Sequence, residues 1–304
     1  MSEVNAVINQ ETPRTDLQEE LANASVSLWK DVVRRFFHHK LAVIGLVVLI
    51  IIALSAIFAP FVAPHDPAFI DEYNRFAIPN AEHIMGTDEL GRDVFSRLVY
   101  GGRISLSVAA LATLVTVFVG TFLGSLAGYY GGWVDNIIMR LADVFFTLPL
   151  LFFVLILAIL MGPGMRTIIL SIGLLSWMTP ARLIRGSLLS LRKMEFIEAA
   201  LAIGVKPSRI IMKHMIPNSL APLIVQGTLD VANVILIESS LSFLGYGIQP
   251  PASSWGTMLS GAQNYMLNAW WLAFWPGMMI LITVLAVNFI GDGLRDALDP
   301  KLKQ

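Results

Sequence analysis

The 304-residue sequence contains no cysteine and few charged residues. Without cysteine, disulfides, thiol catalysis and cysteine-bound metals are excluded. Charged residues make up only 14% of the chain and hydrophobic residues 56%, whereas soluble domains typically hold about 25% charged and at most about 50% apolar residues. The formal net charge of −1 is close to zero, so we expect no nucleic-acid partner. This composition indicates an integral membrane protein.

Motifs for nucleotide hydrolysis, serine hydrolysis and zinc proteolysis are also absent. The sequence has no G-x-x-x-x-G-K-[ST] phosphate loop, no G-x-S-x-G and no H-E-x-x-H. The five histidines show no metal-ligand spacing, because His38 and His39 are adjacent and His65, His83 and His214 stand alone. We therefore expect no catalytic residue, no metal site and no cofactor in this chain.

Six apolar runs are long enough to cross a bilayer at about 1.5 Å per helical residue. They lie at approximately residues 41–62, 103–128, 137–161, 167–190, 217–244 and 271–292. A cleaved signal peptide is the alternative for the first run, but this run and the segment before it are too long for one. Thr179 and Pro180 fall inside the fourth run and should bend that helix. The sequence predicts an all-α membrane protein with six transmembrane helices.

Positive charge indicates how these helices are oriented. If the first helix leaves the cytoplasm, most Lys and Arg residues lie on the cytoplasmic side, which places both termini there. Arg140 and Asp143, three residues apart near the cytoplasmic start of the third helix, are expected to pair with each other. We expect a multi-pass protein of the cytoplasmic (inner) membrane.

The segment before the first span differs from the polar, irregular residues 1–27. Basic residues alternate there with apolar residues that follow helical spacing. The apolar residues are Trp29, Val32, Val33, Phe36 and Phe37. This pattern indicates an amphipathic helix lying in the inner interface against anionic membrane lipid. A simple positive flank of the next helix is the alternative.

A polar, charged segment at residues 195–218, which we call the elbow, separates two apolar runs. On its first helix Phe196, Ala200 and Ile203 share a face, which Ile197 and Leu201 widen. The glycine that follows is expected to stop this helix.

The second half of the elbow should form another short helix. Lys206 and Pro207 cannot continue the first helix, and Ser208 can cap the next one. On that helix Arg209 and Lys213 stack at i,i+4. The elbow is therefore expected to be two short helices with one acidic and one basic face.

The first external loop, at about 63–102, is the longest. Its centre, residues 86–106, is G-T-D-E-L-G-R-D-V-F-S-R-L-V-Y-G-G-R-I-S-L. Thr87 can cap a short helix with Asp88 and Glu89 at its positive end. A second external segment, Leu259 to Gln263, is L-S-G-A-Q and is similar to the L-S-G-G-Q signature of ATPases. Since that signature works only beside a phosphate loop, we expect no nucleotide contact there.

Aromatic residues surround this second external segment. They indicate an extracytoplasmic loop with an aromatic belt at the membrane interface. The aromatic residues and two neighbouring prolines are Pro250, Pro251, Trp255, Tyr265, Trp270 and Trp271.

Two parts of the chain resemble known permeases. Glu198-Ala199-Ala200, Gly204 and Ile216-Pro217 resemble the "EAA" loop of ATP-binding-cassette importer permeases, although His214 stands where that family has an apolar residue. For the elbow alone, an ordinary amphipathic loop of another membrane protein is the alternative. The string at 86–106 resembles the second (C-type) permease subunit of dipeptide, oligopeptide and nickel importers far more specifically.

This second resemblance covers about residue 30 to the C-terminus. It continues through residues 134–143, through E-S-S-L-S-F-L-G-Y-G-I-Q-P-P from Glu238, and through G-D-G-L-R-D-A-L-D-P-K-L near the end. It implies the type I importer permease fold and a subunit that translocates peptides, with nickel chelates as an alternative cargo. The implied partners are a homologous second permease, two ATPase subunits that bind ATP and Mg²⁺, and an extracytoplasmic peptide-binding protein.

The resemblance also implies which residues couple transport to ATP hydrolysis and how the chain divides. The residues expected to contact the ATPase are Glu198, Ala199, Ala200, Gly204, Arg209, Lys213 and Pro217. The expected divisions are a cytoplasmic tail and interfacial helix (1–40), a first span with its external loop (41–102), a five-helix core (103–292) with a coupling loop at 190–217, and a cytoplasmic tail (293–304).

A polar stripe marks the fifth span. Gln226, Asp230 and Asn233 recur at i, i+4 and i+7, within about 60° on a helical wheel. A charge near the bilayer centre costs roughly 2.5–3.5 kcal/mol, so the stripe should face protein or water. It either seals the helix against the fourth helix or a partner subunit, or lines the translocation path. On a path, Asp230 would be a transient partner for a peptide's amino terminus.

A self-sufficient secondary transporter or channel for a small polar solute is the alternative from another class. Such a protein is expected to hold ionisable residues deep in several helices, or discontinuous helices in repeated halves. Here Asp230 is the one clearly mid-membrane acid among the expected spans. An intramembrane enzyme is a weaker alternative, because no catalytic dyad is apparent in any span.

Overall fold

The computed structural model describes residues 30–299, and the secondary structure of this part is helical. It holds no β-strand among the described residues, only an isolated antiparallel bridge between Thr87 and Asp93. The all-α fold is confirmed. The expectation for residues 1–27 and the end of the predicted C-terminal tail, residues 300–304, lie outside the described part.

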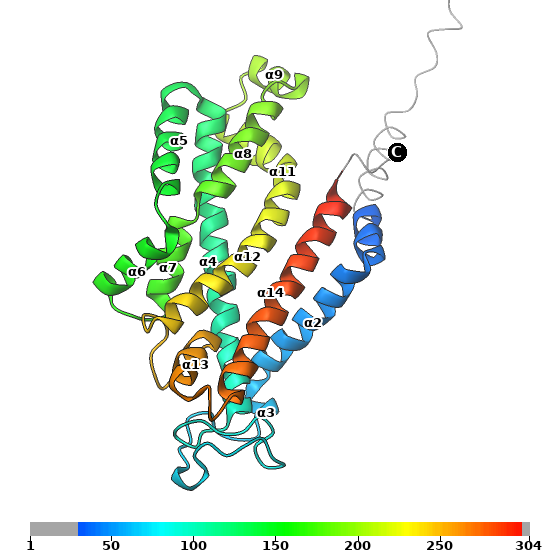
Figure 1. The fold of residues 1–304 in the computed structure, drawn as a ribbon. Helices are drawn as coiled ribbons and strands as arrows, with labels where there is room; N and C mark the ends of the chain where they lie inside the picture. Colours follow the sequence, from blue (N-terminus) through cyan, green and yellow to red (C-terminus); the bar gives the residue numbers. More distant parts are fainter. Residues whose placement is uncertain (1–29, 300–304) are drawn as a thin grey trace, which may run out of the picture.

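The elements follow one another along the described chain after a first helical stretch at residues 30–38 (Figure 1). In order they are α2 (Lys40–Ile57), α3 (Ala59–Val62), the 3₁₀ turn η1 (Glu72–Asn74), α4 (Val94–Tyr130), α5 (Gly132–Phe146), α6 (Leu150–Met161), α7 (Met165–Leu175), α8 (Met178–Leu191), α9 (Glu195–Ala202), α10 (Pro207–Ile210), the π-helical turn η2 (Ile211–Met215), α11 (Ile216–Asn218), α12 (Leu220–Phe243), α13 (Trp255–Ala262), the 3₁₀ turn η3 (Gln263–Tyr265) and α14 (Trp271–Leu298).

Five helical stretches are long and apolar enough to cross a membrane: α2, α4, α7 with α8, α12 and α14. The pair α5 and α6 is apolar enough for a sixth span but is bent by 89°. Pro149 explains the break, since it has no N–H to donate and disfavours the helical conformation of the residue before it. The expected span at residues 137–161 is therefore a pair of helices with a bend between them and not one continuous helix.

Helix α4 starts nine residues before the expected span at 103–128. Asp93 caps it, because Asp93 Oδ2 accepts the N–H of Ser96 at 2.8 Å. The expected cap at Thr87 is wrong: the Thr87 hydroxyl accepts the N–H of Ala77 at 2.8 Å and donates to the carbonyl of Asn74. At the other end of the chain, α14 continues to Leu298, past the expected boundary at residue 292.

The fourth expected span is interrupted near the position that the sequence indicates. α7 ends at Leu175 and α8 begins at Met178, and Pro180 lies in the first turn of α8. Proline is tolerated there because the first N–H groups of a helix have no intrahelical partner.

Helix α4 is the centre of the bundle and packs along α8, α7 and α12, whereas α14 packs between α2 and α12 (Figure 1). Gly120, Gly124 and Gly128 recur at every fourth residue of α4. A Cβ at Gly120 would lie 2.6 Å from Cγ of Pro180, and one at Gly128 would lie 2.9 Å from Cβ of Leu188. This stripe of small residues lets the backbones of α4 and α8 approach closely.

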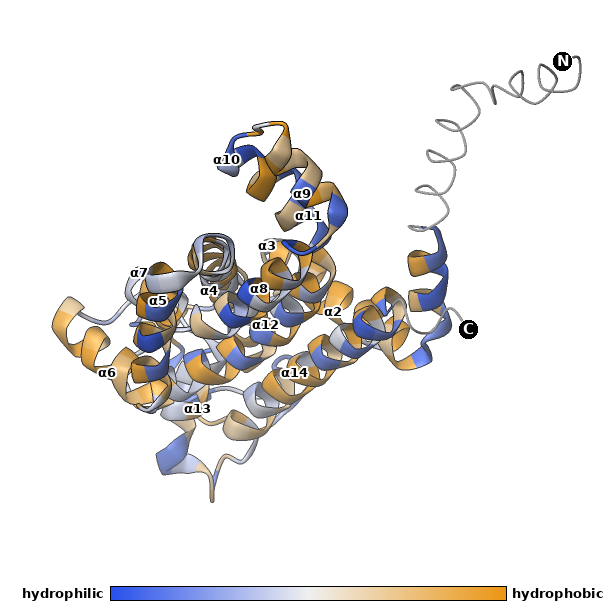
Figure 2. Ribbon diagram, turned by 90° about the horizontal axis from the view of Figure 1, so that it is seen from above, coloured by the Kyte–Doolittle hydropathy of each residue, from blue (hydrophilic) through white to orange (hydrophobic). Residues whose placement is uncertain are grey.

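The two ends of the bundle carry different structures (Figure 1). The elbow, residues 30–38 and the end of α14 lie at one end, and the loops of residues 63–93 lie with α13 at the other. In the view along the bundle, α9 and α10 project beyond the outline of the other helices, and α6 is almost wholly hydrophobic in colour (Figure 2). We call the end of the bundle that carries the elbow the elbow end, and the end that carries α13 the cap end.

Candidate functional site

The elbow consists of two helical segments divided by a glycine. α9 ends in a Schellman motif, in which the N–H of Gly204 bonds to the carbonyl of Leu201 at 3.0 Å and the N–H of Val205 bonds to that of Ala200 at 3.1 Å. Gly204 has φ +75°, a left-handed conformation that glycine adopts without strain. The predicted glycine stop is confirmed.

The second half of the elbow begins at Pro207. The residue before the helix is Lys206, whose side chain makes no capping hydrogen bond, and Ser208 lies inside α10. The predicted serine cap is therefore wrong: proline starts this helix because its fixed φ already suits the first helical position. Pro217 stands in the first turn of α11, as expected.

A small apolar cluster fastens the elbow to the bundle. It joins residues of the elbow to α8, to α12 and to the end of α4. Its buried members are Tyr129, Ile184, Leu188, Ile197, Ile210, Ile211, Met215 and Leu223. On α9 the fully buried residue is Ile197, whereas Phe196 and Ile203 of the predicted apolar face point outward. One side of the elbow thus packs against the bundle, and the opposite side is exposed.

The outer side of the elbow is both apolar and charged. Phe196 is 45% exposed, Met212 65% and Ile203 80%. The coupling residues predicted from the sequence share this exposure, except that Ala200 is half-buried; the exposed ones are Glu198, Ala199, Gly204, Arg209, Lys213 and Pro217. An apolar surface on a projecting segment is typical of a protein-binding site.

The predicted stripe on α12 contains one linked pair. Gln226 Nε2 donates to Asp230 Oδ1 at 2.8 Å, and Asp230 Oδ2 is buried without a hydrogen-bond partner among the described residues. Asp230 and Asn233 line a cavity of about 340 Å³ bounded by α5, α12 and the α7–α8 junction. Gln226 instead lines a groove of about 610 Å³ between α8, α12 and α14. One oxygen of Asp230 is therefore left for a further polar partner.

Helix α12 contains a second membrane-embedded acid that the sequence analysis did not single out. Glu238 is fully buried, where its carboxylate accepts hydrogen bonds from the Ser105 hydroxyl at 3.2 Å and the Ser242 hydroxyl at 2.8 Å. Ser105 Oγ also accepts the backbone N–H of Trp255 at 3.3 Å. Glu238 thus connects α12 to α4 and α13. The contact with Ser242 is local, at i,i+4, but the contact with Ser105 gives no local signal, because it joins two separate segments of the chain.

Ion pairs hold α5 against α8 near the elbow end. Asp135 Oδ2 accepts from Arg185 at 2.6 Å, and Asp143 Oδ1 accepts from Arg182 at 2.6 Å. Arg140 lies 3.7 Å from Asp143, so the predicted pair exists. However, Arg182 is the nearer partner of Asp143 and also stacks on a phenylalanine ring of α5.

The cap end is built on two buried tryptophans. Trp255 Nε1 donates to the carbonyl of Leu98 at 3.0 Å, and Trp271 Nε1 donates to that of Thr87 at 3.2 Å. Trp255 is 0% and Trp271 3% exposed, so the expected interfacial belt is wrong for these two, which are anchors of the core. The L-S-G-A-Q segment runs from Leu259 of α13 into η3, at the cap end.

Two features of the cap concern its titratable groups. The side chain of Asn74 and the backbone N–H of Tyr73 donate hydrogen bonds to Asp71, and these bonds lower the pKa of its carboxyl. The expectation that His65 and His83 stand alone is wrong, since the folded loops bring both to Asp93. Sequence spacing could not show this, because each comes from a different loop segment.

Two protein-family models match this chain. Residues 120–304 match the family model described as binding-protein-dependent transport system inner membrane component. Residues 27–80 match the N-terminal TM domain of oligopeptide transport permease C.

Curated relatives extend the match over nearly the whole chain. The dipeptide transport system permease protein DppC of Bacillus subtilis (strain 168) is 42% identical over 299 residues, which cover 98% of this chain and 93% of that protein. The oligopeptide transport system permease protein OppC of Escherichia coli (strain K12) is 45% identical over 288 residues, covering 94% and 95%.

A solved structure shares the fold. The inward-facing MetNI methionine ABC transporter gives a TM-score of 0.54 at 20% identity and covers 67% of this chain and 97% of the matched chain. The helical bundle, the projecting elbow and the two family matches agree with one another, and the chain belongs to the inner-membrane permease family of binding-protein-dependent ABC transport systems.

Proposed function

We propose that this chain is the C-type permease subunit of an importer that moves dipeptides or oligopeptides into the cytoplasm. The relatives that match over nearly the whole chain are named for dipeptide and oligopeptide transport. The alternatives of a self-sufficient transporter and of a permease for nickel chelates are not favoured by these matches. Peptide length and side-chain preference would be properties of the pathway and of the binding protein.

The observation that best supports this proposal is the elbow, which would be the docking site of an ATPase subunit. Its inner side is fixed by buried Ile197 and Met215, while Phe196 and Ile203 remain exposed outside the bundle. A rigid projection with an apolar tip and flanking charges can insert into a cleft of another subunit. ATP and Mg²⁺ would be bound there by the ATPase and not by this chain.

The positions of the elbow and of the loops at the cap end also support a proposal for the rest of the assembly. The elbow end would face the cytoplasm with both termini, and the cap end would receive an extracytoplasmic peptide-binding protein. A homologous second permease would cover one lateral face, and two ATPase subunits would serve the pair. The polar stripe of Gln226, Asp230 and Asn233 would then face the path between the permeases.

Reconstitution tests the assignment. The chain purified alone should show no ATP hydrolysis and poor stability, and the chain with its companion permease, ATPases and binding protein should import labelled dipeptides or oligopeptides into proteoliposomes. The measurements are phosphate release and accumulated label, with free amino acids as control cargo. Strong ATPase activity of the isolated polypeptide, or peptide uptake without ATPase subunits, would contradict the proposal.

A further inference from the structure

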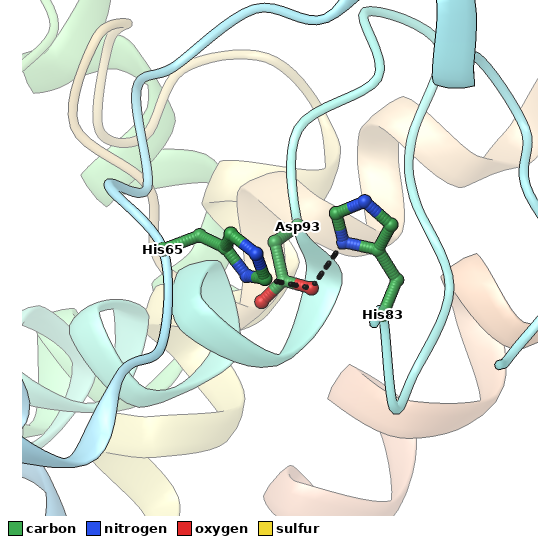
Figure 3. A group of neighbouring side chains, drawn as sticks. All are labelled: His65, His83 and Asp93. Atoms are coloured by element: carbon green, nitrogen blue, oxygen red, sulfur yellow. Dashed lines mark hydrogen bonds and ion pairs between the residues drawn. The ribbon is translucent and has the colours of Figure 1, made fainter. Parts of the chain in front are cut away.

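Three potential metal ligands meet at the cap end. His65 follows α3, His83 belongs to the loop before Gly86, and Asp93 caps α4 (Figure 3). One ligand atom from each of the three lies within 4.8 Å of the others. Figure 3 shows the carboxylate of Asp93 between the two imidazole rings, with both rings turned toward it.

The spacing of these atoms suits a small ion. Asp93 Oδ1 lies 3.0 Å from Nδ1 of His83 and 3.8 Å from Nδ1 of His65. A tetrahedral zinc ion with bonds of about 2.0–2.1 Å holds neighbouring ligand atoms about 3.3 Å apart. These two distances lie on either side of that value. The ligand atoms of the two histidines, which lie within 4.8 Å of each other, would move closer together around an ion.

Asp93 is oriented for this role by the start of α4. Its Oδ2 accepts the backbone N–H of Ser96 at 2.8 Å and the Ser96 hydroxyl at 2.7 Å, which leaves Oδ1 directed to the imidazoles. Outer hydrogen bonds of this kind fix a ligating carboxylate in other metal sites.

Burial supplies the second argument. The Asp93 side chain is 1% exposed, and in the described part of the chain the basic groups within ion-pair distance of it are the two imidazoles. A buried carboxylate is costly without a positive partner. In addition, Nδ1 of His65 is buried and has no hydrogen-bond partner among the described residues. A cation between the three side chains would satisfy both groups.

We propose that His65 Nδ1, His83 Nδ1 and Asp93 Oδ1 bind a divalent transition-metal ion of the zinc class. Imidazole and carboxylate are ligands that such ions accept, and three protein ligands leave the fourth position to water. His83 would bind the ion as the neutral tautomer with its proton on Nε2, because the ligating Nδ1 must carry none. The ion ties the segment after α3 and the loop before Gly86 to the start of α4.

The test measures zinc in the full-length chain purified with its accompanying subunits. The preparation uses an affinity tag without histidine, removal of metal with EDTA, and dialysis against Zn²⁺ without nucleotide. Wild type is compared with His65→Gln, and with His214→Gln as a matched control in the elbow. Because the other subunits are the same in all samples, the difference in zinc content counts the ions at this cluster.

Wild type and His214→Gln should each hold one zinc ion per chain more than His65→Gln, whose zinc affinity should fall at least about 10-fold. Co²⁺ in place of zinc should give the visible absorption of a tetrahedral site in wild type and not in His65→Gln. Without metal, His65→Gln should unfold at the wild-type temperature, and zinc should raise that temperature only in wild type. Equal zinc content in wild type and His65→Gln would overturn the proposal whatever the transport activity.

Discussion

Gly204 determines the direction in which α10 leaves α9. Its φ of +75° closes the Schellman motif, and no atom lies within 4 Å of the position that a Cβ would take. A side chain at this position therefore meets no neighbour, and its cost comes from the backbone conformation alone. For a β-branched residue this strain amounts to about 1 kcal/mol or more.

The first prediction concerns this residue and the exposed acid before it. Gly204→Val and Glu198→Lys should leave the protein in the membrane but abolish peptide uptake, and less ATPase should copurify. Valine would redirect the docking helix, and lysine would reverse a charge on its outer side. Membrane content, uptake and copurified ATPase are measured on the same preparations.

Asparagine is the matched control for Gly204→Val, because it tolerates the left-handed region better than other non-glycine residues. Gly204→Asn should therefore retain most of the uptake that Gly204→Val loses. Normal uptake by both Gly204→Val and Glu198→Lys would mean that the elbow only links two spans.

The close packing of α4 against α8 depends on glycine residues, which have no side chain. The glycine stripe of α4 faces backbone atoms of α8, and a Cβ at Gly124 would meet the backbone of Ala181. Two helices in contact at this distance gain close van der Waals packing, which is the main attraction available between helices in lipid.

Gly124→Ala should therefore lower the stability of the assembled protein by about 1–3 kcal/mol, the usual cost of overpacking. Thermal unfolding in detergent measures this effect. The control is Gly186→Ala, which makes the same substitution on α8, where nothing lies within 4 Å of the new Cβ. Gly186→Ala should be neutral or slightly stabilising, since alanine is the better helix former. Equal unfolding temperatures for the two variants would contradict the close packing of α4 and α8.

Local signals predict the elements that depend on local physics. The elbow could be anticipated because Gly204 and Pro207 act on their own neighbours. The break between α5 and α6 had a signal in Pro149, but it was missed because the apolar residues run on past it. The start of α4 was placed at residue 103, and Thr87 was taken as the cap of a separate short helix, whereas the folded loop makes Asp93 the cap of α4.

The site residues divide in the same way. The exposed face of the elbow follows from helical spacing once the buried side is known, and here Ile197 rather than Phe196 is buried. The contacts of Glu238 with Ser105, and of His65 with Asp93, join separate segments of the chain. No period or motif in one sequence encodes such contacts, so they became visible only in the folded chain.

The path through the assembled transporter should follow the polar face of α12. Gln226→Cys, Asp230→Cys and Asn233→Cys should react with a water-soluble thiol reagent in the assembled complex, and faster during turnover. The physical reason is that the unsatisfied oxygen of Asp230 and the cavity beside it require a polar occupant. The chain contains no native cysteine, so its own background labelling is absent.

Two positions on the other face of α12 serve as controls. Ile235 is fully buried in the main core cluster, and Thr228 lies beside Gly291 of α14. Ile235→Cys and Thr228→Cys should therefore stay unlabelled. Equal labelling of both faces, or labelling of the control positions alone, would exclude this stripe from the path.

Helix α4 has a mechanical consequence for the whole transporter. Its 37 residues contain no proline, and at 1.5 Å per residue they form a rod of about 55 Å, longer than the roughly 40–45 Å of a bilayer with its headgroups. One tip is pinned at Asp93, beside the histidines, and the other ends next to Tyr129 in the cluster that fastens the elbow. If the elbow moved along the axis of α4, the helix would therefore transmit that movement to the cap end.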